Sequence, residues 1–362
     1  MDVNLVLLPG DGIGPEIVQA TKQVLQAIAD RNNHKFQMHE YLLGGCAIDA
    51  YGTAFPDETK EACLRADGIL LGAVGGPKWD DPTASVRPEQ GLLGLRQALK
   101  LFANLRPVKP HSKLLNSSPL RAERLTNVDI LIVRELTGGV YFGKPRERRI
   151  LDDELWALDT MIYGESEIRR IAHKAFQLAK NRRGKVSSVD KANVLESSRL
   201  WRQTVASVAA DYPAINLENV LVDAAAMYLI TQPSRFDVLV TTNLFGDILS
   251  DEASVLTGSM GNLPSASIGD QINRHHLPLG LYEPIHGSAP DIAGKGIANP
   301  IGTILSAAMM LRYSLGLEAE AAQLEKSVDQ VLSDGHRTVD IAAPGESSLD
   351  TSQMTLKIID NL

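Results

Sequence analysis

Short apolar runs alternate with longer amphipathic stretches along most of the chain. The runs expected to form strands are VNLVLL at 3–8, GILLGAV at 68–74, DILIV at 129–133, KVSSV at 185–189, NVLVD at 219–223 and FDVLVTT at 236–242. Residues 16–30 have apolar positions at helical spacing and predict an amphipathic helix. Short apolar strands separated by helices are typical of a mainly parallel sheet covered by helices. The pattern predicts an α/β fold.

One long segment, 135–163, breaks this rhythm. It has glycine pairs, alternation around Val140–Phe142 and no helical period until later. We expect residues 137–162 to form an arm that projects from the sheet. No repeat and no low-complexity segment occurs in the sequence.

Charged residues follow the apolar strand runs in four places. Arg134 comes after DILIV, Lys191 after VSSVD, Asp223 after VLV and Asp247 just past FDVLVTTN. Ligands of open α/β sheets bind beyond the carboxyl ends of the strands. The four side chains therefore predict a convergent site, with unrelated loop residues as the alternative.

The stretch GDGIGP at 10–15 resembles a dinucleotide-binding turn but does not match it. The fingerprint G-x-G-x-x-G requires a third glycine where this chain has Pro15. Asp11 would also face a pyrophosphate with like charge. We expect the glycines to allow close backbone approach in a strand-to-helix turn instead.

The stretch NLFGDILSDEAS at 243–254 places three carboxylates in six residues, Asp247, Asp251 and Glu252. Residues four apart share one helix face, where like charges repel. With Asp223, Asp247 and Asp251 could bind Mg²⁺ or Mn²⁺, which prefer oxygen ligands. The alternative is a helix cap, because Asp247 is expected in a first turn where the dipole favours an anion.

Three arginines, Arg96, Arg106 and Arg134, extend this chemistry. Pro107 disfavours helical geometry at Arg106, so an extended segment is expected there. Guanidinium groups bind carboxylates through two parallel hydrogen bonds. Leu92 and Arg96 are four apart and could share a helix face, although a surface arginine on an amphipathic helix is equally compatible with that spacing. A metal with several arginines predicts a small di- or tricarboxylate substrate.

Composition narrows the class of protein. The chain has 362 residues, 44% of them hydrophobic, and a net charge of −8, which argues against nucleic acid or an anionic membrane as partner. Its 2 cysteines, Cys46 and Cys63, fit a reducing compartment. No run is long enough for a membrane span, and the strand-like start leaves no room for a leader in this sequence. A cytoplasmic location is expected.

Seven motifs then occur in order from about residue 3 to beyond 340. They are GDGIGPE, GGPKWD, LFANLRPVK, RELTGGVYFGKPRER, DKANVLESSRLWR, NLFGDILSDEASVLTGSMG and HGSAPDIAGKGIANP. Together they resemble the metal-dependent β-decarboxylating dehydrogenases of the isocitrate/isopropylmalate dehydrogenase family.

The resemblance implies a two-domain α/β fold with a large mixed, mostly parallel sheet, which is not a Rossmann fold. Residues 1–102 and 256–362 would form a cofactor-binding domain, and residues 103–255 a substrate and dimerisation domain. The arm would intertwine in a homodimer. Each active site would lie in a cleft and take residues from the second subunit.

The resemblance also assigns roles to residues. Arg96, Arg106 and Arg134 would hold the substrate carboxylates, and Asp247 and Asp251 would bind the metal with Asp223 of the other chain. Tyr141 and Lys191 of the other chain would act as acid and base. The loop after residue 285, rather than a glycine-rich turn, would hold the cofactor. The cofactor would be NAD and not NADP, because Asp291 would repel a 2′-phosphate and Ile292 supplies no donor. The expected cofactor-binding residues are Glu283, His286, Gly287, Ser288, Ala289, Pro290, Asp291, Ile292, Asn299 and Asn193.

The segment RPEQGLLGLR at 87–96 bears on the substrate. Leu92, Leu93 and Val194 would suit an isopropyl group, and Glu89 would disfavour a third carboxylate. The expected reaction is the NAD-dependent oxidative decarboxylation of 3-isopropylmalate in leucine biosynthesis. A broader D-malate or tartrate enzyme and a homoisocitrate enzyme are the alternatives. A non-redox Mg²⁺ enzyme such as a phosphatase would leave the Asp291 loop unexplained.

Overall fold

Each of the six predicted runs overlaps a strand of the structure, a computed structural model that describes residues 1–81 and 83–362. The strands are β1 (Asp2–Gly10), β2 (Lys35–Glu40), β3 (Gly68–Ala73), β4 (Leu101–Val108), β5 (Ile130–Glu135), β6 (Arg146–Leu151), β7 (Glu154–Asp159), β8 (Lys185–Asp190), β9 (Asn216–Leu221), β10 (Val238–Thr241), β11 (Pro264–Ile272) and β12 (Pro278–Pro284). The helices are α1 (Gly14–Arg31), α2 (Gly45–Tyr51), α3 (Asp57–Arg65), α4 (Pro88–Ala98), α5 (Ala122–Leu125), α6 (Glu165–Ala179), α7 (Glu196–Ala209), α8 (Val222–Thr231), α9 (Asn243–Ser254), α10 (Ile301–Tyr313), α11 (Glu318–Ser333) and α12 (Thr351–Asp360).

The chain forms two compact units. Unit 1 comprises Met1–Leu101, Pro110–Arg121 and Ser254–Leu362, and unit 2 comprises Phe102–Lys109 and Ala122–Ala253. Residues 110–121 thus belong to unit 1, whereas the sequence placed them in the middle segment. Ten strands make up the large mixed, mostly parallel sheet that the sequence predicted, which confirms the fold class.

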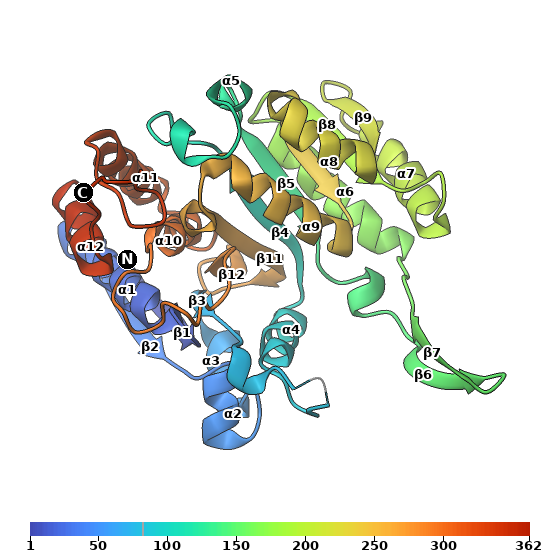
Figure 1. The fold of residues 1–362 in the computed structure, drawn as a ribbon, viewed down its shortest axis with the longest axis horizontal. Helices are drawn as coiled ribbons and strands as arrows, with labels where there is room; N and C mark the ends of the chain where they lie inside the picture. Colours follow the sequence, from blue (N-terminus) through green and yellow to red (C-terminus); the bar gives the residue numbers. More distant parts are fainter. Residues whose placement is uncertain (82) are drawn as a thin grey trace. The chain divides into compact units, whose positions relative to one another are not determined.

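The strands of unit 1 follow the order β2-β1-β3-β12-β11. All neighbours in this order are parallel except β11 and β12, which are antiparallel. Helix α10 packs on β11, β12 and β3, while α1 packs on β1 and β3 and is itself covered by α12 (Figure 1). Leu5, Leu7 and Ile69 in these strands are fully buried. The buried strands read as near-continuous apolar runs for this reason.

The strands of unit 2 follow the order β4-β5-β10-β8-β9, and only β4 and β5 are antiparallel. Helix α6 packs on β5, β8 and β10, and α7 packs on β8 and β9 (Figure 1). Trp201 and Phe176 are fully buried between helices and sheet. Arg106 lies in β4, so the extended segment predicted from Pro107 is correct.

The predicted arm contains a two-stranded ribbon, β6 and β7 (Figure 1). Its turn consists of Asp152 and Asp153 in left-handed conformation, which matches the twist of a tight hairpin. Ile150 and Leu155 pair across the ribbon and are 72% and 66% exposed. A two-stranded ribbon is only marginally stable alone, and clustered exposed apolar side chains mark interaction surfaces.

The GDGIGP turn owes its glycines to close backbone approach, as predicted. A Cβ on Gly10 would lie 1.9 Å from the carbonyl oxygen of Ala73, and one on Gly12 would lie 2.0 Å from that of Ser288. Both glycines have positive φ. Asp11 in this turn accepts hydrogen bonds from the backbone N–H groups of Gly45, Cys46 and Gly75.

Across residues 1–81 and 83–362, none of the helices combines the length and the apolar composition needed to cross a bilayer.

The two cysteines are free thiols with different environments. Burial raises the pKa of Cys63 to about 12, and burial with the nearby Asp11 carboxylate raises that of Cys46, which is only half-buried. Since the thiolate is the reactive form, we expect iodoacetamide at pH 8 to label Cys46 slowly and Cys63 only after unfolding. Mass spectrometry of the labelled native and denatured protein measures this, and rapid native labelling of Cys63 would contradict its burial.

Candidate active site

Two of the predicted metal ligands, Asp247 and Asp251, lie one turn apart on α9. This helix begins at Asn243, which places Asp247 in its second turn and corrects the expectation of a first-turn position. A helix dipole acts within the first turn. Capping therefore does not account for Asp247.

Arginine side chains supply the positive charge beside these carboxylates. Arg106 Nη1 lies 3.3 Å from Asp251 Oδ1, and Arg106 Nη2 lies 3.8 Å from Asp247 Oδ1. Arg134 Nη1 donates to the same oxygen of Asp247. Arg134 is the penultimate residue of β5 rather than the residue after its end, and both arginines are buried. Unit 2 thus brings two predicted carboxylate-binding residues against two predicted metal ligands.

The pKa values of the two aspartates are shifted in opposite directions. Burial raises the pKa of Asp247, but the guanidinium of Arg134, the Tyr141 hydroxyl and Arg106 outweigh it, so that the net pKa is lowered. Burial raises the pKa of Asp251, and the neighbouring charge of Asp247 adds to the increase, against the opposing effect of Arg106. Asp247 is thus the more strongly acidic of the pair.

Tyr141 joins the same group. It ends a 3-10 turn (Gly139–Tyr141) that precedes the β6–β7 ribbon. Its hydroxyl donates to Asp247 Oδ2 at 2.7 Å. The turn is anchored by the buried carboxylate of Glu135, which accepts hydrogen bonds from the N–H groups of Thr137 and Gly138 at 2.8 Å each.

Lys191 and Asp223 form a second group in unit 2. Lys191 directly follows β8, and its Nζ lies 2.9 Å from Asp223 Oδ1. Strand β9 ends at Leu221, so Asp223 lies in the first turn of α8 and not at a strand end as the sequence suggested. The hydrogen bond from Lys191 lowers the pKa of Asp223. Within the described part of one chain, no three His, Cys, Asp or Glu side chains gather as a metal site.

Arg96 has a different partner in unit 1. Its Nη2 donates to Glu283 Oε1 at 2.9 Å, and both side chains are buried. Its Nε is also buried and has no hydrogen-bond partner among the described residues. A buried orphan donor is costly unless a ligand satisfies it.

The residues predicted to contact the substrate side chain lie on two elements. Leu92 and Leu93 are half-buried on α4, the same helix as Arg96, whereas Glu89 is exposed near its start. Asn193 and Val194 are exposed in the turn after Lys191. In unit 1, α4 therefore presents two leucines and a buried arginine.

The predicted cofactor loop, 286–292, packs against the GDGIGP turn at 10–15 and the start of α1. Ile13 N–H donates to the Ser288 carbonyl at 2.9 Å, and Ala289 and Ile292 pack on Ile13 and Ile17. Burial lowers the pKa of His286, whose Nε2 is buried without a partner in the described chain. Gly287, Pro290 and Asp291 are exposed. The loop thus combines a buried imidazole of lowered pKa with an accessible carboxylate.

The side chain of Asn299, a predicted cofactor-binding residue, is held by other groups of unit 1. Its Nδ2 donates to Asn262 and Asp340, and its Oδ1 accepts from the N–H of Ile301 at 3.0 Å. The sequence interpretation did not single out Asp340, which is 41 residues away along the chain.

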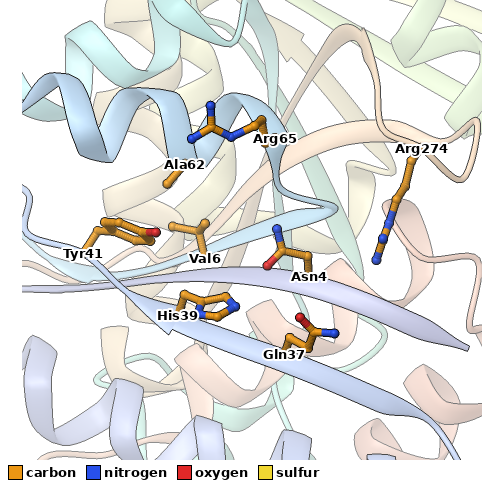
Figure 2. Close-up of a pocket in the computed structure, with 8 residues that line it drawn as sticks. All are labelled: Asn4, Val6, Gln37, His39, Tyr41, Ala62, Arg65 and Arg274. Atoms are coloured by element: carbon orange, nitrogen blue, oxygen red, sulfur yellow. The ribbon is translucent and has the colours of Figure 1, made fainter.

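A polar pocket of about 300 Å³ lies elsewhere in unit 1 (Figure 2). Asn4 and Gln37 pair across β1 and β2 in its wall, and Arg65 and Arg274 border it. Arg274 is already paired with the buried Asp67, its Nε lying 3.0 Å from each carboxylate oxygen. No predicted site residue lines this pocket.

Sequence reasoning missed Asn243 and Glu135, although both stand inside quoted motifs. Asn243 contacts Arg134 and Gly138, which are more than 100 positions away. Spacing along the chain cannot reveal such partners. The available signal for Asn243 was a polar residue directly after the apolar run FDVLVTT.

Comparison with known proteins adds independent information. The sequence model described as "Isocitrate/isopropylmalate dehydrogenase" matches residues 4–358. The 3-isopropylmalate dehydrogenase of Anaeromyxobacter dehalogenans is 58% identical over 362 residues, covering 100% of both chains. That of Bacillus subtilis is 55% identical over 349 residues, covering 96% of this chain and 94% of the relative.

Two solved structures have the same fold. The isocitrate dehydrogenase from Methylococcus capsulatus superposes with a TM-score of 0.86 at 36% identity, covering 99% of each chain. A beta-decarboxylating dehydrogenase from Thermococcus kodakarensis superposes with a TM-score of 0.78 at 34% identity, covering 99% of this chain and 96% of that one.

Proposed function

Because this chain belongs to the isocitrate/isopropylmalate dehydrogenase family, we propose that it catalyses the NAD-dependent oxidative decarboxylation of 3-isopropylmalate. The products are 2-oxo-4-methylpentanoate and CO₂, and the reaction is a step of leucine biosynthesis. The observation that carries the proposal is the set of full-length relatives named 3-isopropylmalate dehydrogenase at 54% to 58% identity.

In the proposed reaction, Arg96, Arg106 and Arg134 bind the two carboxylates of the substrate. All three are buried, at 9%, 8% and 3% exposure. Their attraction for a carboxylate is therefore stronger than it would be in water, because the effective dielectric constant is lower. The orphan Nε of Arg96 supports its part in this proposal, because a substrate carboxylate would satisfy it. Leu92, Leu93 and Val194 contact the isopropyl group.

Carboxylates fit a hard divalent ion, and we assign Asp247, Asp251 and a second copy's Asp223 to Mg²⁺ or Mn²⁺. The loop 286–292, with Glu283, Asn193 and Asn299, holds NAD. His286 supports this assignment through its orphan buried nitrogen, and Asp291 through its exposed carboxylate, which would accept from a ribose diol. When bound, the metal lowers the pKa of the substrate hydroxyl and NAD⁺ accepts the hydride.

The protein's own groups move the protons. Lys191 takes the hydroxyl proton while the hydride leaves C2, which gives a 2-oxo acid with a carboxylate β to the ketone. That carboxylate leaves as CO₂, and its bonding electrons form an enolate. Tyr141 then donates its proton to C3, which completes the 2-oxo product. The arginines hold the substrate in one orientation throughout, so the steps follow without release.

Shared sites in a homodimer complete the proposal. Lys191 and Asp223 contact each other in one chain, while Asp247 and Asp251 lie with Arg106 and Arg134. The proposed dimer brings the first group of one chain to the second group of its partner. The exposed apolar ribbon β6–β7 supports such an association, since it would be covered there. A cytoplasmic location is part of the proposal.

The direct test measures NADH formation with 3-isopropylmalate, D-malate, isocitrate and tartrate in parallel, with Mn²⁺ and with EDTA. We expect a large preference for 3-isopropylmalate that EDTA abolishes. Comparable rates on D-malate or tartrate would replace the substrate assignment with a broader 2-hydroxy-acid enzyme. No NADH with any of the four would overturn the redox function.

A specificity prediction concerns Leu92 and Leu93 on α4. We expect the double variant Leu92→Ser, Leu93→Asn to lower kcat/KM for 3-isopropylmalate far more than for unbranched D-malate. Losing this apolar contact should cost about 2–4 kcal/mol of transition-state binding. Steady-state kinetics on both substrates measure the difference, with the exposed Leu356→Ser on α12 as control. Equal decreases in kcat/KM for the two substrates would contradict the assignment of Leu92 and Leu93 to an apolar pocket.

A further inference from the structure

Asn243, the first residue of α9, is a buried amide at the centre of the unit 2 site. It is 2% exposed, and each polar group of its side chain has a protein partner. Its Oδ1 accepts from Arg134 Nε at 3.0 Å and from Arg134 Nη2 at 2.8 Å. Its Nδ2 donates to the carbonyl oxygen of Gly138 at 3.3 Å.

The oxygen of this amide fixes the orientation of Arg134. Nε and Nη2, on one edge of the guanidinium, both donate to this oxygen, which sets the plane of the guanidinium group. The remaining edge carries Nη1, which donates to Asp247. An arginine held in this way loses less conformational freedom when a carboxylate binds.

The nitrogen of the same amide holds the turn that carries Tyr141. The backbone N–H of Asn243 also donates to the Tyr163 hydroxyl at 2.8 Å, and that ring fills the space beside Gly138 and Gly139. The turn ends at Tyr141, whose ring lies 5.7 Å from the Arg134 guanidinium. One side chain therefore contacts the arginine through its oxygen and the tyrosine turn through its nitrogen.

We propose that Asn243 is a positioning residue that keeps Arg134 and the Gly138–Tyr141 turn in one fixed arrangement, so that carboxylate binding and proton donation occur on the same substrate pose. This rests on the proposed function, which gives Arg134 and Tyr141 their roles. An amide is needed because the site requires an acceptor and a donor on one short side chain. Aspartate keeps the acceptor but lacks the donor, and its charge competes with substrate for Arg134.

The test is a double-mutant cycle of Asn243→Ala with Arg134→Gln, measured with 3-isopropylmalate, NAD⁺ and Mn²⁺. Hydrogen bonds to a charged group are worth enough that Asn243→Ala should raise KM about 10- to 100-fold. If Asn243 acts through Arg134, the double variant should be little worse than Arg134→Gln alone. Asn243→Asp, closer in shape, should also raise KM.

Asn273→Ala is the matched control. Asn273 is also a buried amide, and its Nδ2 donates to the carbonyls of Asp67 and Ser314, away from the predicted site. It should lower the melting temperature by a similar amount and leave KM unchanged. Fully additive losses in the cycle, or an Asn243→Ala protein that loses stability with normal KM and kcat, would overturn the positioning role.

The same proteins separate this inference from the proposed function. Calorimetric titration with 3-isopropylmalate and Mn²⁺ gives Kd for each variant without requiring turnover. If the wild type binds but forms no NADH, the proposed function fails and the cycle in Kd still decides the role of Asn243. If the wild type does not bind, Arg134 holds no substrate carboxylate, and the positioning role fails with it.

Discussion

Lys191→Ala and Asp251→Ala proteins should each be inactive, yet unfolding them together and refolding should restore about a quarter of the wild-type rate. Random pairing makes half of the dimers mixed. In a mixed dimer, one of the two sites receives Asp251 from one chain and Lys191 from the other, and the second site lacks both. Activity of the mixture against each variant treated alone measures this effect.

The control for that experiment is a mixture of Lys191→Ala with Asp223→Ala. These residues contact each other in one chain, at 2.9 Å, and would enter the same site together. In a mixed dimer of these two variants, each site lacks one of them, so activity should stay absent. No recovery with Lys191→Ala and Asp251→Ala, although mixed dimers are shown to form, would argue that the sites are not shared.

Tyr141→Phe should lower kcat about 10²- to 10⁴-fold, as expected for the loss of a general acid. The change removes one hydroxyl, which donates to Asp247 at 2.7 Å from a half-buried side chain, so stability should change little. KM for 3-isopropylmalate should change less than kcat because the arginines remain. Steady-state kinetics and a thermal melt of the same preparation measure both quantities.

Tyr212→Phe provides the matched comparison. Tyr212 is also in unit 2, and its hydroxyl forms a hydrogen bond of 3.0 Å with His173 away from the arginines. Loss of the Tyr212 hydroxyl should leave kcat unchanged. Similar kcat values for the two variants would remove Tyr141 from the proton-donating role.

The sequence predicted the fold and the charge chemistry of unit 2 well because both depend on short-range pattern. The spacing of Asp247 and Asp251 placed them on one helix face, and Pro107 placed Arg106 in a strand, as observed. The same pattern could not locate the ends of strands and helices to better than one or two residues. Asp223 therefore lies in α8 instead of at the end of β9.

Long-range polar contacts were beyond sequence reasoning. Glu135 stands beside Arg134 in the chain, but its function as an anchor for the Gly138 turn follows only from where its carboxylate points. Burial raises the pKa of Glu135, while hydrogen bonds from Thr137 and Gly138 oppose the increase. Neither the burial nor these bonds can be read from the spacing of residues along the chain. Arg96 and Glu283 are likewise 187 positions apart and meet only through the fold.

Unit 1 is built mainly from the two ends of the chain, and all of unit 2 lies between these ends in the sequence. Strand β3 pairs with β12, and α1 is covered by α10 and α12, so some of the partners of the first hundred residues are made only with the last third of the chain. Unit 2 obtains all of its segments once residue 253 has been made. During synthesis we therefore expect unit 2 to become protease-resistant first, while β3 still lacks β12 and α1 still lacks α10 and α12 until the last third of the chain has been made.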